Sequence, residues 1–232
     1  MEDLNWSRFS HALICRTNRL VFLQAFPGCI GWSAIATFLP DFIHRDLGFT
    51  QRGATAIMSC FGVSGLIGAI VGGGVGQQVY ESNRKGLPFF IACCSAFAAI
   101  PMMLLVTSGS VNSPTLTAIL ALLGGVATAA GPNLKGILMN ANPSADRGSV
   151  FALFTLVDHL GKGIGPSVVV LVSLVTGSRA TAMVFAFGFW IVSAFVMIQL
   201  ESCLVEDTLN VEIKEGGESV GAREPFDLFG VY

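Results

Sequence analysis

Residues 53–80 read GATAIMSCFGVSGLIGAIVGGGVGQQVY, and none of these side chains is charged. A helix needs about 20 predominantly apolar residues to cross the hydrocarbon core of a bilayer. The apolar residues run on without the regular alternation with polar ones that marks a strand of a membrane barrel. Because a helix satisfies its own backbone hydrogen bonds, it suits a solvent that offers none. The stretch therefore predicts a membrane-spanning helix.

Five further spans are expected around this one. Residues 20–40, 148–175 and 180–200 each form an apolar run long enough for one crossing. The charge-free run 86–134 is too long for one crossing, and the polar break from Thr107 to Pro114 divides it into two. The expected fold class is an all-α membrane protein with six transmembrane helices in residues 20–200.

The composition of the whole chain fits a bilayer. Of its 232 residues, 53% are hydrophobic and 12% are charged, whereas soluble domains carry about 25% charged residues. This shortage of charge argues against a soluble enzyme. No cluster of Lys and Arg interleaves with aromatic residues, so the expected partners are membrane lipids and not nucleic acid. The six cysteines form no C-x-x-C pair and are expected to be packing residues, and no metal or cofactor is expected.

Basic residues predict the orientation, because cytoplasmic loops carry an excess of Lys and Arg. Six spans place both termini on one side, and that side holds the larger basic group, which comprises Arg8, Arg16, Arg19, Arg84, Lys85, Arg147, Lys214 and Arg223. Both termini are therefore expected in the cytoplasm. Residues 1–19 are expected to form a cytoplasmic linker with an amphipathic start. Residues 201–232 carry eight acidic residues and are expected to form a disordered cytoplasmic tail.

Small residues repeat along the span 53–80. Gly68, Gly72 and Gly76 are spaced four residues apart and share one helical face. Such ladders let helix backbones approach closely in lipid. The ladder has two readings that are compatible, plain helix packing and a surface that slides during transport.

Ser64 lies in the same span, in the sequence Gly62-Val63-Ser64-Gly65. This sequence fits the G-x-S-G pattern of rhomboid intramembrane proteases, which need a histidine base in a later helix. The one in-membrane histidine of the chain is His159, and the last span has none. A protease is therefore a minor alternative.

Two Pro-Gly pairs interrupt expected spans. Pro27-Gly28 lies in the first span and Gly131-Pro132 in the fourth, which are the first helices of the two halves if six spans divide as three plus three. Interrupted helices in corresponding positions indicate an internal repeat with a binding site between the repeats. Ordinary transmembrane prolines are the alternative.

The span 148–175 contains the most costly side chains of the chain, Asp158, His159 and Lys162. Asp158 is eleven residues past Arg147 and thus roughly 16 Å deep at about 1.5 Å per residue. Lys162 is four residues on, so that the two charges share a face and can offset each other. The three residues predict either a proton or substrate site or a closed structural pair. Lys135 is expected to reach the cytoplasmic surface.

The stretch from Gly76 to Lys85 reads GQQVYESNRK and resembles the cytoplasmic loop signature of the major facilitator superfamily. Gly76 matches the signature glycine, and Arg84 and Lys85 match its basic end. Arg147 precedes the fifth span and is grouped with them as a gating-loop residue. Tyr80 stands where the signature has an acid, and Glu81 is the nearest substitute.

Two further stretches resemble the Spinster-like branch of that superfamily. They are LVFLQAFPGCIGWSAIATFLPDFI in the first span and PSADRGSVFALFTLVDHLGKGIGP around the fifth. The resemblance implies a secondary transporter, among which are lipid and lysophospholipid carriers, built from twelve helices. This chain then corresponds to the C-terminal six helices, half of a major-facilitator fold with a 3+3 inverted repeat. It is expected to work with a second six-helix half or as a homodimer.

The resemblance and the residues together predict a transporter that moves a small solute or lipid-like substrate by alternating access, without covalent chemistry. Asp158, His159 and Lys162 are the candidates for proton coupling or for binding substrate charge. The candidate cavity-lining residues are Gln24, Trp32 and Asn133, as polar or amphipathic groups on the interrupted helices. A truncated scaffold or regulator that transports nothing is the main alternative.

Overall fold

The computed structural model describes residues 12–107 and 113–221, with side chains up to residue 215. It is helical throughout, and no strand occurs in these ranges. The elements are α2 (Arg16–Arg45), α3 (Gln51–Ser82), α4 (Gly86–Thr107), α5 (Pro114–Gly124), η1 (Gly125–Ala129), α6 (Ala130–Asn140), α7 (Arg147–Thr176), α8 (Arg179–Gln199) and α9 (Glu201–Gly221). Six helical stretches are long and apolar enough to cross a membrane, so the expected all-α fold is confirmed.

Local sequence sets several helix ends. The side chains of Thr50, Ser113 and Ser178 each accept a backbone N–H in the first turn of α3, α5 and α8. These caps satisfy amides that a helix start leaves unpaired. Gly177 ends α7 with a φ of 67°, a left-handed conformation that glycine adopts without strain.

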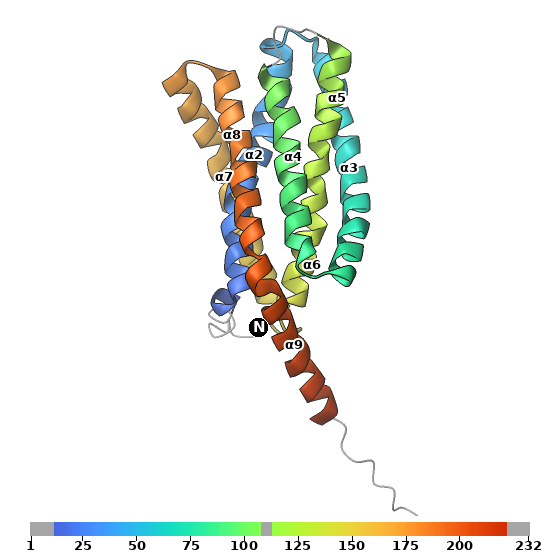
Figure 1. Ribbon diagram of the computed structural model, residues 1–232. Helices are drawn as coiled ribbons and strands as arrows, with labels where there is room; N and C mark the ends of the chain where they lie inside the picture. The colour runs from blue at the N-terminus through green and yellow to red at the C-terminus, as the bar shows by residue number, and fades with distance from the viewer. Residues whose placement is uncertain (1–11, 108–112, 222–232) are drawn as a thin grey trace, which may run out of the picture.

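The helices pack as an upright bundle, with α9 leaving it at the lower end (Figure 1). α2 is the best-buried span, with 61% of its most apolar window buried, and it packs against α7 and α8. The corresponding buried shares are only 22% for α3 and 17% for α7. These two helices therefore offer most of their apolar surface to lipid or to another protein body.

The fourth span is interrupted just before the predicted Gly131-Pro132 pair, and the first span is not interrupted. The 3₁₀ segment η1 separates α5 from α6, and Gly131-Pro132 follows it in the first turn of α6. Pro27, in contrast, lies inside the continuous helix α2. The two Pro-Gly pairs thus have different local structures.

The expectation of a disordered tail is corrected for residues 201–221, which form α9. Composition alone suggested disorder, but Cys203, Leu204, Thr208 and Val211 recur at helical spacing and are buried. That face packs on the end of the bundle and stabilises the helix. Residues 222–232 of the expected tail, and residues 1–11 of the expected linker, lie outside the described residues.

Candidate functional site

A cavity of about 610 Å³ lies between α2, α6, α7 and α8, and residues of η1 and α4 complete its lining. Its wall mixes apolar and aromatic side chains with a few polar ones, as small-molecule sites do. The sequence-predicted residues Gln24, Trp32, Asp158 and Lys162 all line it, so the structure brings four of the six candidates together.

Asp158 and Lys162 form an ion pair on the cavity wall. The Nζ atom of Lys162 lies 2.6 Å from Oδ2 of Asp158, one helical turn away. The thiol of Cys29 in α2 donates to the other carboxylate oxygen, Oδ1, at 2.8 Å. Both carboxylate oxygens therefore have partners, and the pair links α7 to α2. The Cys29 contact could not be predicted, because it depends on how α2 and α7 pack.

His159 is separated from this pair. Its side chain is exposed on α7 and does not line the cavity. Successive residues of a helix point about 100° apart, so a neighbour of Asp158 in sequence faces elsewhere. The structure thus keeps Asp158 and Lys162 as a unit and places His159 outside it.

Gln24 is buried on the α2 side of the cavity, with 4% of its surface exposed. The hydroxyl of Ser193 in α8 donates to its Oε1 at 2.7 Å. Its Nε2 has no partner, and it is the one such buried side-chain nitrogen or oxygen among the described residues. A buried donor left unpaired costs about 1–3 kcal/mol, so this amide is a costly feature of the wall.

Two tryptophans belong to the aromatic part of the wall, together with Phe151 and Phe154 of α7. The ring of Trp32 lies 5.3 Å from that of Trp190 and 5.9 Å from that of Phe61. Trp190 donates its Nε1–H to the carbonyl oxygen of Gly28 at 2.9 Å. Gly31 lies directly beneath the Trp190 ring, where a Cβ atom would overlap it. Glycines in α2 thus make room for the indole that closes one side of the cavity.

Asn133 was expected to line the cavity, but it lies away from it. It is buried between α6 and α3, and its Nδ2 donates to the carbonyl oxygens of Gly72 at 2.9 Å and Ala129 at 2.7 Å. A Cβ atom at Gly76 would overlap the Asn133 amide. The side chain therefore ties α6 to the glycine face of α3.

The glycine ladder of α3 packs on the interrupted fourth span. A Cβ atom at Gly68 would come within 2.7 Å of the Thr128 hydroxyl, and one at Gly72 would overlap Ala129. The structure shows the close packing that the sequence predicted for Gly68, Gly72 and Gly76.

A second close approach involves Gly161 and Gly165 of α7, which the sequence analysis did not single out. A Cβ atom at Gly161 would lie 2.7 Å from the Phe26 carbonyl oxygen, and one at Gly165 would overlap the Ser33 hydroxyl. Both positions face α2, on either side of the turn that holds Lys162. Their i, i+4 spacing was a signal that sequence reasoning could have used.

Arg84 forms an ion pair with Glu212 of α9. Its Nη1 and Nη2 atoms donate to Glu212 at 3.2 and 2.8 Å, a two-bond contact that raises the pKa of the Arg84 guanidinium. Glu81, the substitute that the sequence offered, instead accepts from Gln77 at 2.9 Å. The position of Glu212 could not be predicted while α9 was taken as disordered.

The other loop residues lie at the same end of the bundle. Arg147 donates its Nε–H to the carbonyl oxygen of Asn142 at 3.2 Å. Ser144, in the same loop, donates its backbone N–H to Glu215 of α9 at 2.8 Å. Lys85 lines a separate surface depression with residues of α2 and α9. α9 therefore contacts both loops that carry the residues predicted to act in gating.

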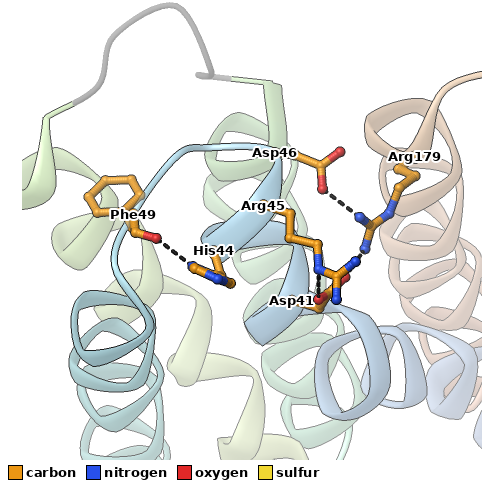
Figure 2. Close-up of polar contacts among 6 residues, drawn as sticks. All are labelled: Asp41, His44, Arg45, Asp46, Phe49 and Arg179. Atoms are coloured by element: carbon orange, nitrogen blue, oxygen red, sulfur yellow. Dashed lines mark hydrogen bonds and ion pairs between the residues drawn. The ribbon is translucent and has the colours of Figure 1, made fainter.

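An ionic network closes the opposite end of the bundle (Figure 2). Arg179, at the start of α8, donates to Asp41 and to Asp46, each at 2.7 Å. Arg45 also pairs with Asp41 at 2.7 Å, and His44 donates to the carbonyl oxygen of Phe49 at 2.7 Å. The network holds the end of α2 against the start of α8.

The structure gives the protease alternative no support. The hydroxyl of Ser64 donates to the carbonyl oxygen of Phe61 at 3.0 Å, and the residue packs against Gly125. No described histidine is hydrogen-bonded to it, and no metal-binding cluster occurs among the described residues.

The chain was compared with family profiles and with curated proteins. No curated protein matches it, whereas one family profile does. The family profile named Major Facilitator Superfamily matches residues 21–218, which include the cavity, the loops that carry Arg84 and Arg147, and most of α9. Six apolar spans, the Gly76–Lys85 signature and this match agree: the chain belongs to the major facilitator superfamily of membrane transporters.

Proposed function

We propose that the chain forms one wall of an alternating-access transporter and that the cavity beside Asp158 holds the transported solute. The observation that carries the proposal is the cavity itself, where an ion pair, a buried amide and two indoles meet near the middle of the spans. Charged groups inside a membrane are costly and commonly mark a solute or proton pathway. No covalent step is needed for such a function.

The Asp158–Lys162 pair is the proposed coupling element. Protonation of the carboxylate would weaken its bond to Lys162 and release the ammonium group toward the cavity. The side chain of Lys162 is 48% exposed and that of Asp158 is 22% exposed, which leaves both open to exchange. His159 faces away from the pair, so the coupling role is proposed for the pair alone.

A second six-helix body is proposed to complete the cavity, either another half of a twelve-helix unit or a second copy. The low burial of α3 and α7 supports this, because both leave apolar surface to be covered. The sequences of α2 and α7 support the Spinster-like branch and hence an amphiphilic substrate. The count of basic residues supports a cytoplasmic location for α9 and both termini.

Uptake in proteoliposomes tests the proposal, with the chain alone and with a matching half supplied. The probe is a fluorescent lysophospholipid, added with and without a pH gradient, and internalisation is read by protection from an external quencher. Asp158→Asn is expected to lose at least about tenfold of gradient-driven uptake, because one partner of the ion pair on the cavity wall is removed and Lys162 is left unpaired. Glu206→Gln, an exposed acidic residue of α9, is the matched control.

The double variant Asp158→Asn with Lys162→Met separates the readings. A coupling pair predicts that the double variant regains the folding yield of the wild type but not its driven uptake. Recovery of both would show a structural pair. Wild-type uptake by Asp158→Asn contradicts the coupling role. If the wild-type chain transports nothing, either alone or with a matching half, the scaffold alternative is supported.

A further inference from the structure

The polar groups on the cavity wall are unequally satisfied. Asp158 has both oxygens occupied, one by Lys162 and one by Cys29. Lys135 of α6 also lines the cavity, and no described side chain pairs with its ammonium group. Gln24 adds a buried amide whose Nε2 is unpaired. The two nitrogen groups on the wall that lack a side-chain partner, Gln24 Nε2 and Lys135 Nζ, are therefore donors.

Ser193 explains why Gln24 offers a donor. Its hydroxyl bonds to Oε1 of Gln24 at 2.7 Å, and it lies against Gly28, where a Cβ atom would be 3.3 Å from the hydroxyl oxygen. The acceptor end of the amide is thus used within the wall. The donor end has no partner, but it is buried, so a group that enters the cavity reaches it only when the terminal amide rotates.

The net charge of the wall also favours a ligand that brings hydrogen-bond acceptors. Lys162 is neutralised by Asp158, so Lys135 leaves the cavity with one net positive charge. A ligand that satisfies an ammonium group and an amide N–H must bring oxygen acceptors and negative charge. Carboxylates and phosphates have both.

We propose that Gln24 and Lys135 form an oxyanion subsite in the cavity, which binds the carboxylate or phosphate group of the transported solute. The subsite is separate from the Asp158–Lys162 pair and rests on the proposed function only in taking the cavity as the solute site. Ser193 is a positioning residue that holds the amide. Trp32 lines the same cavity and reports on its occupancy.

Binding is tested on the full chain in detergent through its tryptophan fluorescence. Trp6→Phe removes the third indole of the chain and leaves Trp32 and Trp190, which both line the cavity. The probes are inorganic phosphate, octyl phosphate and octyltrimethylammonium. Saturation by inorganic phosphate indicates a small anionic solute, and saturation by octyl phosphate alone indicates an anionic headgroup on an amphiphile. Either result supports the subsite.

Variants of Gln24 and Lys135 test whether these two residues bind the anion. Gln24→Glu and Lys135→Met are each expected to weaken anion binding at least about tenfold, since each removes a bond to a charged ligand group. Gln78→Glu on α3 and Lys214→Met on α9 make the same exchanges at exposed positions outside the cavity and are expected to bind as the wild type does. Equal stability of Lys135→Met and wild type on heating excludes a folding artefact.

Three outcomes overturn the subsite: no saturation by either anion, tighter binding of the ammonium probe, or unchanged anion binding in both cavity variants. Anion binding that is lost in the variants, together with absent uptake in proteoliposomes, leaves the subsite standing and contradicts the proposed transport. The two proposals can therefore fail separately.

Discussion

Gly72 of α3 and Gly165 of α7 each hold a neighbouring helix at close range, yet they border different surroundings. Gly72 meets Ala129 in a contact that is closed by the Asn133 amide. Gly165 meets Ser33 of α2 near the cavity that holds Asp158. The α3 contact has its polar groups satisfied within the bundle, whereas the α7 contact borders unsatisfied ones. Close glycine packing thus fixes α3 against the fourth span, whereas between α7 and α2 it shapes the wall of the cavity.

The largest expected effect is that of Gly72→Leu on stability. The new side chain would overlap Ala129 and come within 2.8 Å of its Cα atom, so that backbone has to move. Overpacking of this kind costs about 1–3 kcal/mol, or more where backbone is displaced. Thermal unfolding in detergent should show a clear decrease in midpoint.

Gly74→Leu is the matched control, because a Cβ atom there meets nothing within 4 Å. It should unfold like the wild type. Equal midpoints for the two leucine variants would mean that the α3 joint is loose and that the comparison with α7 does not hold.

Gly165→Leu should have a smaller effect on stability and a larger one on the cavity. Its new side chain would displace the Ser33 hydroxyl, which can rotate, and would lie 2.9 Å from the Ser33 Cβ atom, which cannot, so that α7 moves away from α2. The nearest backbone atom, the Ile30 Cα, would be 3.3 Å away, farther than the Ala129 Cα atom is at Gly72. The expected cost is about 1 kcal/mol, with loss of anion binding as read from Trp32. Gly163→Leu has open space around it and serves as the control. Binding that persists in Gly165→Leu would show that the α2–α7 contact does not shape the site.

The sequence alone predicted the features that are determined within a single helix. Apolar runs predicted the six spans, and i, i+4 spacing predicted the α3 ladder and the Asp158–Lys162 pair. Partners from distant helices were missed, as with Cys29 for Asp158 and Ser193 for Gln24, since these contacts form only when the helices pack. Asn133 was expected in the cavity because it follows Pro132, but the rotation of α6 turns it toward α3.

A smaller effect is expected at the end of the bundle that α9 contacts. Glu212→Gln removes the acid that Arg84 contacts through two hydrogen bonds. The pair is exposed, and such pairs are worth about 0.2–1 kcal/mol. The variant should raise the amide hydrogen exchange of α9 without lowering the unfolding midpoint of the bundle. Unchanged exchange would mean that the buried face of α9 alone holds it in place.

The smallest effect concerns pH at the same end. The backbone N–H of Ser144 bonds to Glu215 and holds the pKa of that carboxyl below its ordinary value of 4.5. Because the docked form has the lower pKa, its contribution is present above pH 4.5 and is lost as the pH falls through the lowered value. A nitroxide attached at the exposed position 213 should therefore become more mobile in that acidic range. Glu215→Gln should already be mobile at neutral pH and respond less to acid, whereas Glu206→Gln should titrate like the wild type. A nitroxide whose mobility follows pH equally in Glu215→Gln would show that another group loosens α9.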